Sequence, residues 1–310
     1  MKEVNFDKLN QEIKNSTIKN ISITKALGYL AKPFDKQGVA QKCYERGYDN
    51  PGNKYYHMTV EEIIESWNSK AKTSMEYGKK LDSYIGAVLS SSDEELELYK
   101  LYNNVDTDER LKAHCHAFDE FYKRMTKSGD TYIVCREQPL FYKLNDNYSL
   151  QGRFDALAYN KRTKKLIVID WKSNAEVETN IDRFTENLLG PANDLPAKSW
   201  WAYTMQTFFY RMCLEQPQYL EYMKSVVGDD ITGISTLVVN LPEHPYNNPK
   251  ACMGNGDVYS CFGPAFDYNV DKMNSIFDFC IKVDNITSKK KETPINETKK
   301  VEMNTEEDLF

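Results

Sequence analysis

The spacing of apolar residues changes near residue 128, and this change limits the folds that the chain can adopt. Upstream, apolar residues recur at helical spacing, and the pair Thr59 and Glu62 in MTVEEIIESWNSKA predicts a capping box at a helix start. Downstream, short apolar runs alternate with turn residues, which is typical of strands. The strand-like runs cover 131–144, 148–160, 164–173 and 232–242, and helical patterns cover 195–217 and 263–283. Together they predict an α/β fold with a mixed sheet flanked by helices.

The chain divides into three parts by composition. Residues 1–74 combine helical patterns with Pro, Gly and Asn, which predicts a helical, partly irregular N-terminal extension. Residues 75–285 carry the alternation of helices and strands and form the predicted core. Residues 286–310 consist mainly of Lys, Glu, Thr and Asn, which predicts a disordered tail that is first basic and then acidic.

Charge and cysteine usage exclude several classes of protein. The net charge of −6 argues against a general nucleic-acid-coating protein, although it is compatible with one local basic groove. The polar start MKEVNFDKLNQEIKN has no signal-peptide pattern, and no run reaches the length of a transmembrane helix, so we expect no membrane association. Seven cysteines without a CxxC pair predict reduced thiols in a cytoplasmic protein.

Acidic side chains interrupt two neighbouring apolar runs. Asp155 lies within the run 148–160, and the run LIVID ends in Asp170, followed by Trp171 and Lys172. Alternate residues of a strand face opposite sides, so Asp170 and Lys172 share a face that Trp171 does not. If the two runs pair, Asp155 approaches Asp170, and their carboxylates with the Trp171 carbonyl favour Mg²⁺ or Mn²⁺. Lys172 would then hold the attacking water or stabilise a phosphate during metal-assisted phosphodiester hydrolysis.

This pattern resembles the PD-(D/E)xK nuclease superfamily. The stretches QGRFDALAYN and KLIVIDWKSN are similar to the GxxDxi…xxxxDxKT core of its RecB-like and phage-exonuclease branch, with Ser173 where that branch often has Thr. The resemblance implies a restriction-endonuclease-like core and a Mg²⁺-dependent DNA nuclease, of the exonuclease type, in recombination, repair or phage DNA processing. It assigns metal binding to Asp155 and Asp170 and a catalytic role to Lys172.

Further matches extend the resemblance beyond these two runs. Glu137 in REQPLF stands where the branch often carries a supporting, catalytic glutamate. Gln206 and Tyr210 share a helix face and resemble its QxxxY motif, whose residues face the active site and the DNA backbone. In YGKKLDSYI, Asp82 takes the histidine place of a GxxxH motif, where a carboxylate would also bind Mg²⁺. The remaining expected DNA contacts are Arg153 and Ser173.

Two other functions stay open from the sequence. One is an endonuclease of the same fold, either restriction or junction-resolving, and the other is a non-catalytic DNA-binding protein or replisome adaptor. The intact Asp155, Asp170 and Lys172 argue against the adaptor, although they could also form a simple salt bridge at a hairpin end. The tip EEDLF of the predicted tail resembles a sliding-clamp-binding peptide or the acidic tip of single-strand-binding protein, which predicts docking to such a partner.

Overall fold

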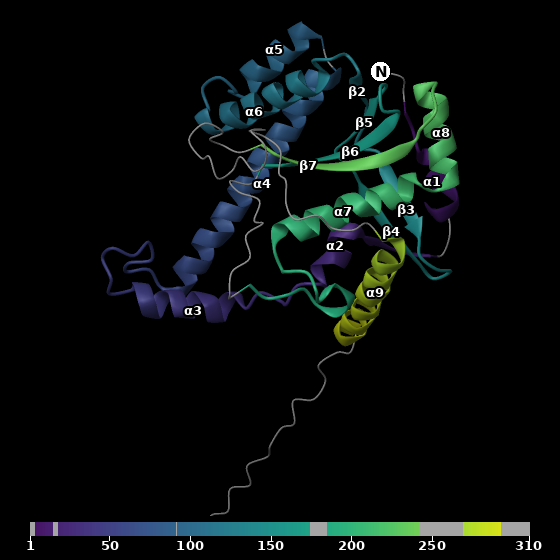
Figure 1. Ribbon diagram of the computed structural model, residues 1–310. Helices are drawn as coiled ribbons and strands as arrows, with labels where there is room; N and C mark the ends of the chain where they lie inside the picture. The colour runs from purple at the N-terminus through teal and green to yellow at the C-terminus, as the bar shows by residue number, and fades with distance from the viewer. Residues whose placement is uncertain (1–3, 15–17, 91, 174–184, 242–268, 293–310) are drawn as a thin grey trace, which may run out of the picture.

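The computed structural model describes residues 4–14, 18–90, 92–173, 185–241 and 269–292 (Figure 1). The N-terminal elements are α1 (Asp7–Lys14), β1 (Lys19–Ser22), α2 (Ile23–Gly28), α3 (Lys36–Gly47), α4 (Val60–Ser90), α5 (Asp93–Tyr102) and α6 (Glu109–Thr126). The strands that follow are β2 (Thr131–Arg136), β3 (Pro139–Lys143), β4 (Tyr148–Arg153), β5 (Ala156–Asn160) and β6 (Lys165–Lys172). The last described elements are a 3-10 turn (Gly190–Ala192), α7 (Ser199–Leu214), α8 (Pro217–Val227), β7 (Gly233–Asn240) and α9 (Val270–Glu292).

Two sheets organise the described part of the chain. The larger has the order β2-β5-β6-β7, in which β2, β5 and β6 pair antiparallel and β7 runs parallel to β6. The smaller has the order β1-β4-β3, with β1 parallel to β4. Helices α4 and α6 cover one face of the larger sheet, and α7 packs between its other face and the smaller sheet (Figure 1). The predicted α/β fold with mixed pairing flanked by helices is confirmed, but the strands form two sheets instead of the single mixed sheet expected.

Helix α7 is the central helix of this arrangement. Eleven of its 16 residues are buried, including Trp200 and Trp201 at its start. A helix that is apolar on nearly all sides belongs in a core, because each of its faces needs a partner. Its range agrees with the helix predicted before Pro217, and it packs against β6 and β7 of the larger sheet and β3 of the smaller.

Two of the predicted strands each divide into strands of different sheets. The run 131–144 divides at Glu137 into β2 and β3, and the run 148–160 divides at Asp155 into β4 and β5. Glu137 has a φ of 49°, which ends β2 because strand residues need a negative φ. The two breaks adjoin, since the backbone N–H of Glu137 donates to the Asp155 carbonyl at 3.3 Å. The chain therefore changes sheets twice at one junction.

Helix α4 crosses the predicted domain boundary between residues 74 and 75 without interruption. Its capping box is confirmed, because Thr59 N–H donates to Glu62 Oε2 at 2.7 Å and Glu62 N–H donates to Thr59 Oγ1 at 3.2 Å. Strand β1 pairs with β4, and α1 packs on β3. The predicted extension and the predicted core thus share one continuous helix and one sheet.

The C-terminal end of the described chain is helical. Because α9 extends to Glu292, residues 286–292 of the predicted tail are helical rather than irregular. Residues 293–310, which include the EEDLF tip, lie outside the described residues. Within the described ranges, no helix combines the length and apolar character needed to cross a membrane.

Candidate active site

A cavity of about 290 Å³ lies at the junction where the chain changes sheets. Its wall comes from four places: helix α4, the β2–β3 turn, the β4–β5 turn and the end of β6. The lining residues are Gly78, Leu81, Asp82, Ile85, Glu137, Arg153, Asp155, Trp171 and Ser173. Six of these nine were candidate site residues from the sequence, so the fold brings together positions from four separate stretches of chain.

Asp155 and Asp170 stand opposite each other at the ends of two paired strands. Strands β5 and β6 are antiparallel with Ala156 opposite Ile169, so one further step of this register sets Asp155 opposite Asp170. Asp155 Oδ2 accepts a hydrogen bond of 2.6 Å from the backbone N–H of Trp171, which holds this carboxylate across the end of the pair. The pairing expected from the sequence is therefore present, and it places two acids side by side.

Lys172 supplies a positive charge beside these acids. Its Nζ lies 2.6 Å from Asp170 Oδ2 and 4.5 Å from the centre of the Tyr203 ring on α7. The Asp170 side chain is 1% exposed and that of Lys172 is 17% exposed. Asp170 and Lys172 are not in the wall of the cavity, whereas Asp155 is. The ion pair thus lies behind Asp155, on the α7 side of the larger sheet.

Trp171 faces the other side of the sheet, as the alternation along the strand predicts. Its ring packs edge-on against Phe118 and Phe121 of α6, with centroid distances of 5.5 and 5.6 Å. This packing fixes the end of β6 from one side, while α7 fixes it from the other.

Burial raises the pKa values of both acids. Burial, together with the charge of Asp170, raises the pKa of Asp155 to about 7. Burial also raises the pKa of Asp170, against the opposing effect of Lys172. For Lys172, burial alone would lower the pKa, but the charges of Asp170 and Asp155 outweigh it and raise the pKa. The lysine therefore stays charged, while the two carboxylates would be stabilised by a further cation.

The donor set at this place fits Mg²⁺ or Mn²⁺. Asp170 Oδ2 is buried and accepts no well-aligned hydrogen bond, although Lys172 pairs with it electrostatically. Mg²⁺ is commonly held by one or two carboxylates with waters and other oxygens, and Asp155 and Asp170 supply two. Among the described residues, no three His, Cys, Asp or Glu side chains gather closely enough to hold a metal. The other ligands would therefore be water, substrate or the predicted Trp171 carbonyl.

The outer wall of the cavity pairs acids with arginines. Asp82 Oδ1 accepts a hydrogen bond of 2.8 Å from Arg136 Nη2, and Glu137 Oε1 lies 3.7 Å from Arg153 Nη2. Burial raises the pKa of Asp82, against the charge of Arg136. The Arg153 side chain is 63% exposed, so its long pair with Glu137 can be exchanged for a phosphate. Metal binding by Asp82 stays a prediction, because Arg136 holds one of its oxygens.

A hydrogen-bond chain from α7 supports the β4–β5 turn. Gln206 Nε2 donates to Tyr210 Oη at 2.8 Å, and Tyr210 Oη donates to the Arg153 carbonyl at 2.9 Å. A Cβ on Gly152 would come within 2.7 Å of the Tyr210 ring, so glycine permits this close approach. Tyr210 is 1% exposed. Tyr210 therefore positions the turn before Asp155 from inside the protein and does not reach the surface, where a DNA contact was expected. A DNA contact by Gln206 stays a prediction.

Besides the lining residues Gly78, Leu81 and Ile85, two residues that contact the site were not predicted from the sequence. Arg136 directly precedes Glu137 at the end of a strand-like run, and this position is the only sequence signal for its ion pair with Asp82. Tyr203 lies one turn before Gln206, so the helical repeat could have placed it on the same face. Their partners come from distant parts of the chain, which the sequence pattern does not identify.

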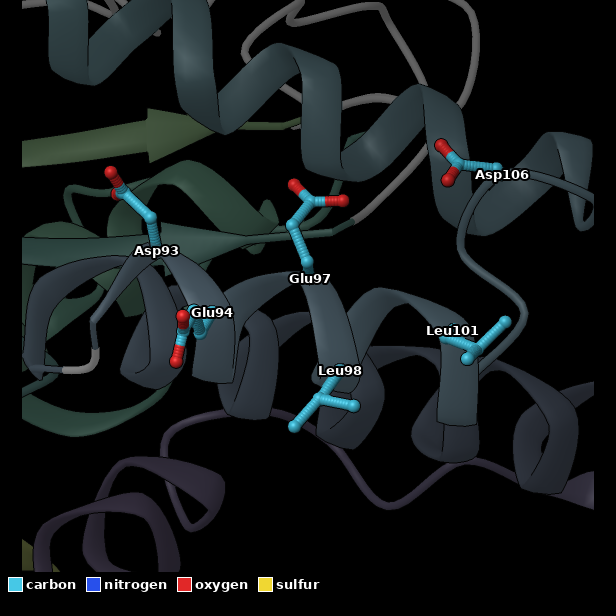
Figure 2. Close-up of a pocket in the computed structure, with 6 residues that line it drawn as sticks. All are labelled: Asp93, Glu94, Glu97, Leu98, Leu101 and Asp106. Carbon is cyan, nitrogen blue, oxygen red and sulfur yellow. The ribbon is translucent and has the colours of Figure 1, made fainter.

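A larger hollow, of about 740 Å³, lies over α5 and the loop after it (Figure 2). Its lining residues are Asp93, Glu94, Glu97, Leu98, Leu101 and Asp106. Figure 2 shows the four carboxylates spread along the helix and loop and pointing in different directions. They do not converge, and their charge opposes an anionic substrate, although Glu97 pairs with Lys100 at 2.8 Å. The smaller cavity is therefore the better candidate for the active site, despite its size.

A scan against protein-family models and a search of curated proteins gave no match for this chain. Its function is therefore inferred from the residues and their geometry.

Proposed function

We propose that this protein is a Mg²⁺-dependent deoxyribonuclease with a restriction-endonuclease-like core, acting as an exonuclease of the RecB-like and phage type. The observation that carries the proposal is the arrangement of Asp155, Asp170 and Lys172 at one end of the larger sheet. A simple salt bridge at a hairpin end would be exposed to water, whereas this lysine and Asp170 are largely buried. Burying charges costs free energy, so a buried acid pair with a single lysine supports a functional role.

Asp155 and Asp170 would hold the cation. When bound, it would act as a Lewis acid on the scissile phosphate and lower the pKa of the attacking water. Lys172 keeps its ammonium charged beside these acids and would stabilise negative charge on the phosphate. The Tyr203 ring packs against this ammonium and limits its orientation.

The residues around the cavity would position the DNA. Arg153 and Ser173 lie in its wall and offer a guanidinium and a hydroxyl to phosphate oxygens. Glu137 would support the site from the β2–β3 turn, and Gln206 would contact the backbone from α7. Tyr210 would act indirectly, through the Arg153 carbonyl.

The test is incubation of the purified protein with linear and covalently closed circular duplex DNA, in Mg²⁺ or in EDTA. Loss of the linear DNA alone, and only with Mg²⁺ or Mn²⁺, is the expected result, because an exonuclease needs an end. Metal-dependent cutting of the circle would replace the exonuclease with a restriction or junction-resolving endonuclease. If linear, circular and single-stranded DNA all stay intact, the nuclease proposal fails and a non-catalytic adaptor is the better description.

A further inference from the structure

The middle of α4 is exposed on every side. All residues from 68 to 76 are exposed, so the helix passes through solvent for more than two turns. Figure 1 shows α3 and the first half of α4 standing away from the sheets. The second half of the same helix carries Gly78, Leu81 and Asp82 into the wall of the cavity. A helix exposed all round in this way is typical of one that connects two parts of a molecule.

Four exposed side chains form a row that begins in this segment and continues one turn beyond it. Asn68, Lys72, Met75 and Lys79 are spaced at i, i+4, i+7 and i+11, which places them along one face of a helix. We call this row the α4 stripe. At its outer end Lys36 of α3 donates a hydrogen bond to Asn68 Oδ1. At its inner end the next turn carries Asp82, in the wall of the cavity.

The chemistry of the α4 stripe fits a polynucleotide. The surrounding sequence SKAKTSMEYGKK contains four lysines and one glutamate, within a chain whose net charge is −6. Phe34 lies at the outer end beside Trp67, with ring centroids 6.2 Å apart, and is 67% exposed. Met75 within the stripe is 63% exposed. Lysines next to exposed rings and apolar groups are the combination that pairs with phosphates and stacks on bases.

We propose that the α4 stripe binds the DNA strand that leads into the cavity, with Phe34 as a stacking platform at its outer end. This inference rests on the proposed function, because continuity with the cavity identifies the occupant as the substrate strand. From Asn68 to Asp82 the helix rises about 20 Å, which equals the axial length of roughly six nucleotides of one duplex strand, at 3.4 Å of helix axis each. The acidic hollow over α5 offers no comparable surface to an anionic strand.

The test is DNA binding by the double variant Lys72→Glu/Lys79→Glu. Its matched control is Lys127→Glu/Lys165→Glu. This variant makes the same charge change at exposed positions near the N-terminal ends of β2 and β6, whereas the cavity lies at their C-terminal ends. Binding of a fluorescein-labelled 20-nucleotide strand and of its duplex is measured by anisotropy in EDTA over a range of salt concentrations. We expect the stripe variant to bind at least about tenfold more weakly, with a salt slope smaller by about 2, and the control to bind as the wild type does.

A second pair of variants tests the stacking platform. Phe34→Ala should weaken binding of the single strand about fivefold or more, since stacking on one base contributes that much. Leu101→Ala, which trims an equally exposed apolar residue on α5, should not weaken it.

The outcomes separate this inference from the proposed function, because binding in EDTA does not depend on cleavage. Wild-type protein that binds DNA through the stripe but never cleaves it would support the stripe and refute the nuclease. A stripe variant that binds like the wild type, or a control that weakens equally, would overturn the stripe. A wild-type dimer that the stripe variant dissociates, with DNA binding unchanged, would also overturn it, by assigning the stripe to contacts between copies.

Discussion

The backbone N–H of Trp171 donates a hydrogen bond of 2.6 Å to Asp155 Oδ2, although the Trp171 side chain lies on the opposite face of the sheet. The bond lies just beyond the last paired residues of β5 and β6, and it connects the backbone of β6 directly to the Asp155 carboxylate. It aligns Asp155 with Asp170 at the point where the chain leaves one sheet for the other. The position of the candidate metal ligand is therefore set by the backbone of the neighbouring strand.

Magnesium affinity should depend on pH through Asp155. Because burial and Asp170 raise the pKa of Asp155 to about 7, a proton competes with the cation below that pH. Calorimetric titration of the wild type should give an affinity for Mg²⁺ about tenfold weaker at pH 6 than at pH 8. Asp155→Asn should bind weakly at both pH values. Equal wild-type affinity at the two pH values would contradict the assignment of this carboxylate.

Removal of the Tyr210 hydroxyl should slow cleavage without weakening substrate binding. Tyr210→Phe loses the hydrogen bonds to Gln206 and to the Arg153 carbonyl, which should lower the free energy of unfolding by about 1–2 kcal/mol. We expect kcat to fall roughly tenfold with KM unchanged, as for other supporting residues. Tyr219→Phe, which removes a buried hydroxyl bonded to Asn10, is the matched control and should lose stability but not activity. A rise in KM alone would assign Tyr210 to substrate contact instead.

Replacing Glu137 with glycine should raise stability but lower activity. Its φ of 49° is unfavourable for a residue with a side chain, so Glu137→Gly should raise the free energy of unfolding by about 1 kcal/mol. The same change removes a carboxylate from the cavity wall and should lower cleavage roughly tenfold. Lys164→Gly, at a φ of 52° in the β5–β6 turn, should gain less stability, because it also loses the 2.9 Å ion pair with Asp229, and should keep its activity. Chemical denaturation and cleavage rates of the three proteins check this, and an equally active Glu137→Gly would remove Glu137 from the site.

Acid should destabilise the junction between α9 and the N-terminal elements. The buried Asp284 pairs with Lys19 and Lys25 and accepts a hydrogen bond from Tyr29, each at 2.6 Å. Burial alone would raise its pKa, but these three partners outweigh burial and hold the pKa of Asp284 far below its usual range. Because the unfolded chain takes up the proton first, near pH 4, the stabilisation is complete above about pH 5 and declines as the pH falls further.

The measurement for Asp284 is the difference in unfolding free energy between the wild type and Asp284→Asn as a function of pH. At pH 7 the variant should be less stable by about 2 kcal/mol, since it loses hydrogen bonds to charged groups. The difference should shrink between pH 5 and pH 3. A difference that stays constant over this range would show that the charge of Asp284 contributes nothing to stability.

Strand pairing and the central helix could be predicted from the sequence because their signals are local. The run LIVID is apolar on both faces, NKRTKK supplies turn residues, and the apolar helix before Pro217 is long enough to identify. The same turn predicts that Asp155 lies beside Asp170, since the register of a hairpin follows from its turn.

The changes of sheet could not be predicted, because periodicity continues through them. The run TYIVCREQPLFYKL keeps a strand-like pattern across Glu137, and only the backbone conformation of that residue separates β2 from β3. The continuity of α4 could not be predicted for the opposite reason. Residues 68–76 have no apolar face to signal a helix, so packing at both ends and a good N-cap maintain it. The burial of Tyr210 depends on Gly152, which lies far away in sequence.

The most direct test of the central claim is the rate at which Asp155→Asn and Lys172→Ala degrade end-labelled linear duplex DNA in Mg²⁺. Asp146→Asn, in the exposed β3–β4 turn, is the matched control, and thermal unfolding and DNA binding in EDTA verify that each variant is folded. If Asp155 and Lys172 belong to a metal-dependent nuclease site, both variants should lose activity by about a thousandfold or more, while Asp146→Asn keeps the wild-type rate. Folded variants that degrade DNA within about twofold of the wild-type rate would contradict the claim.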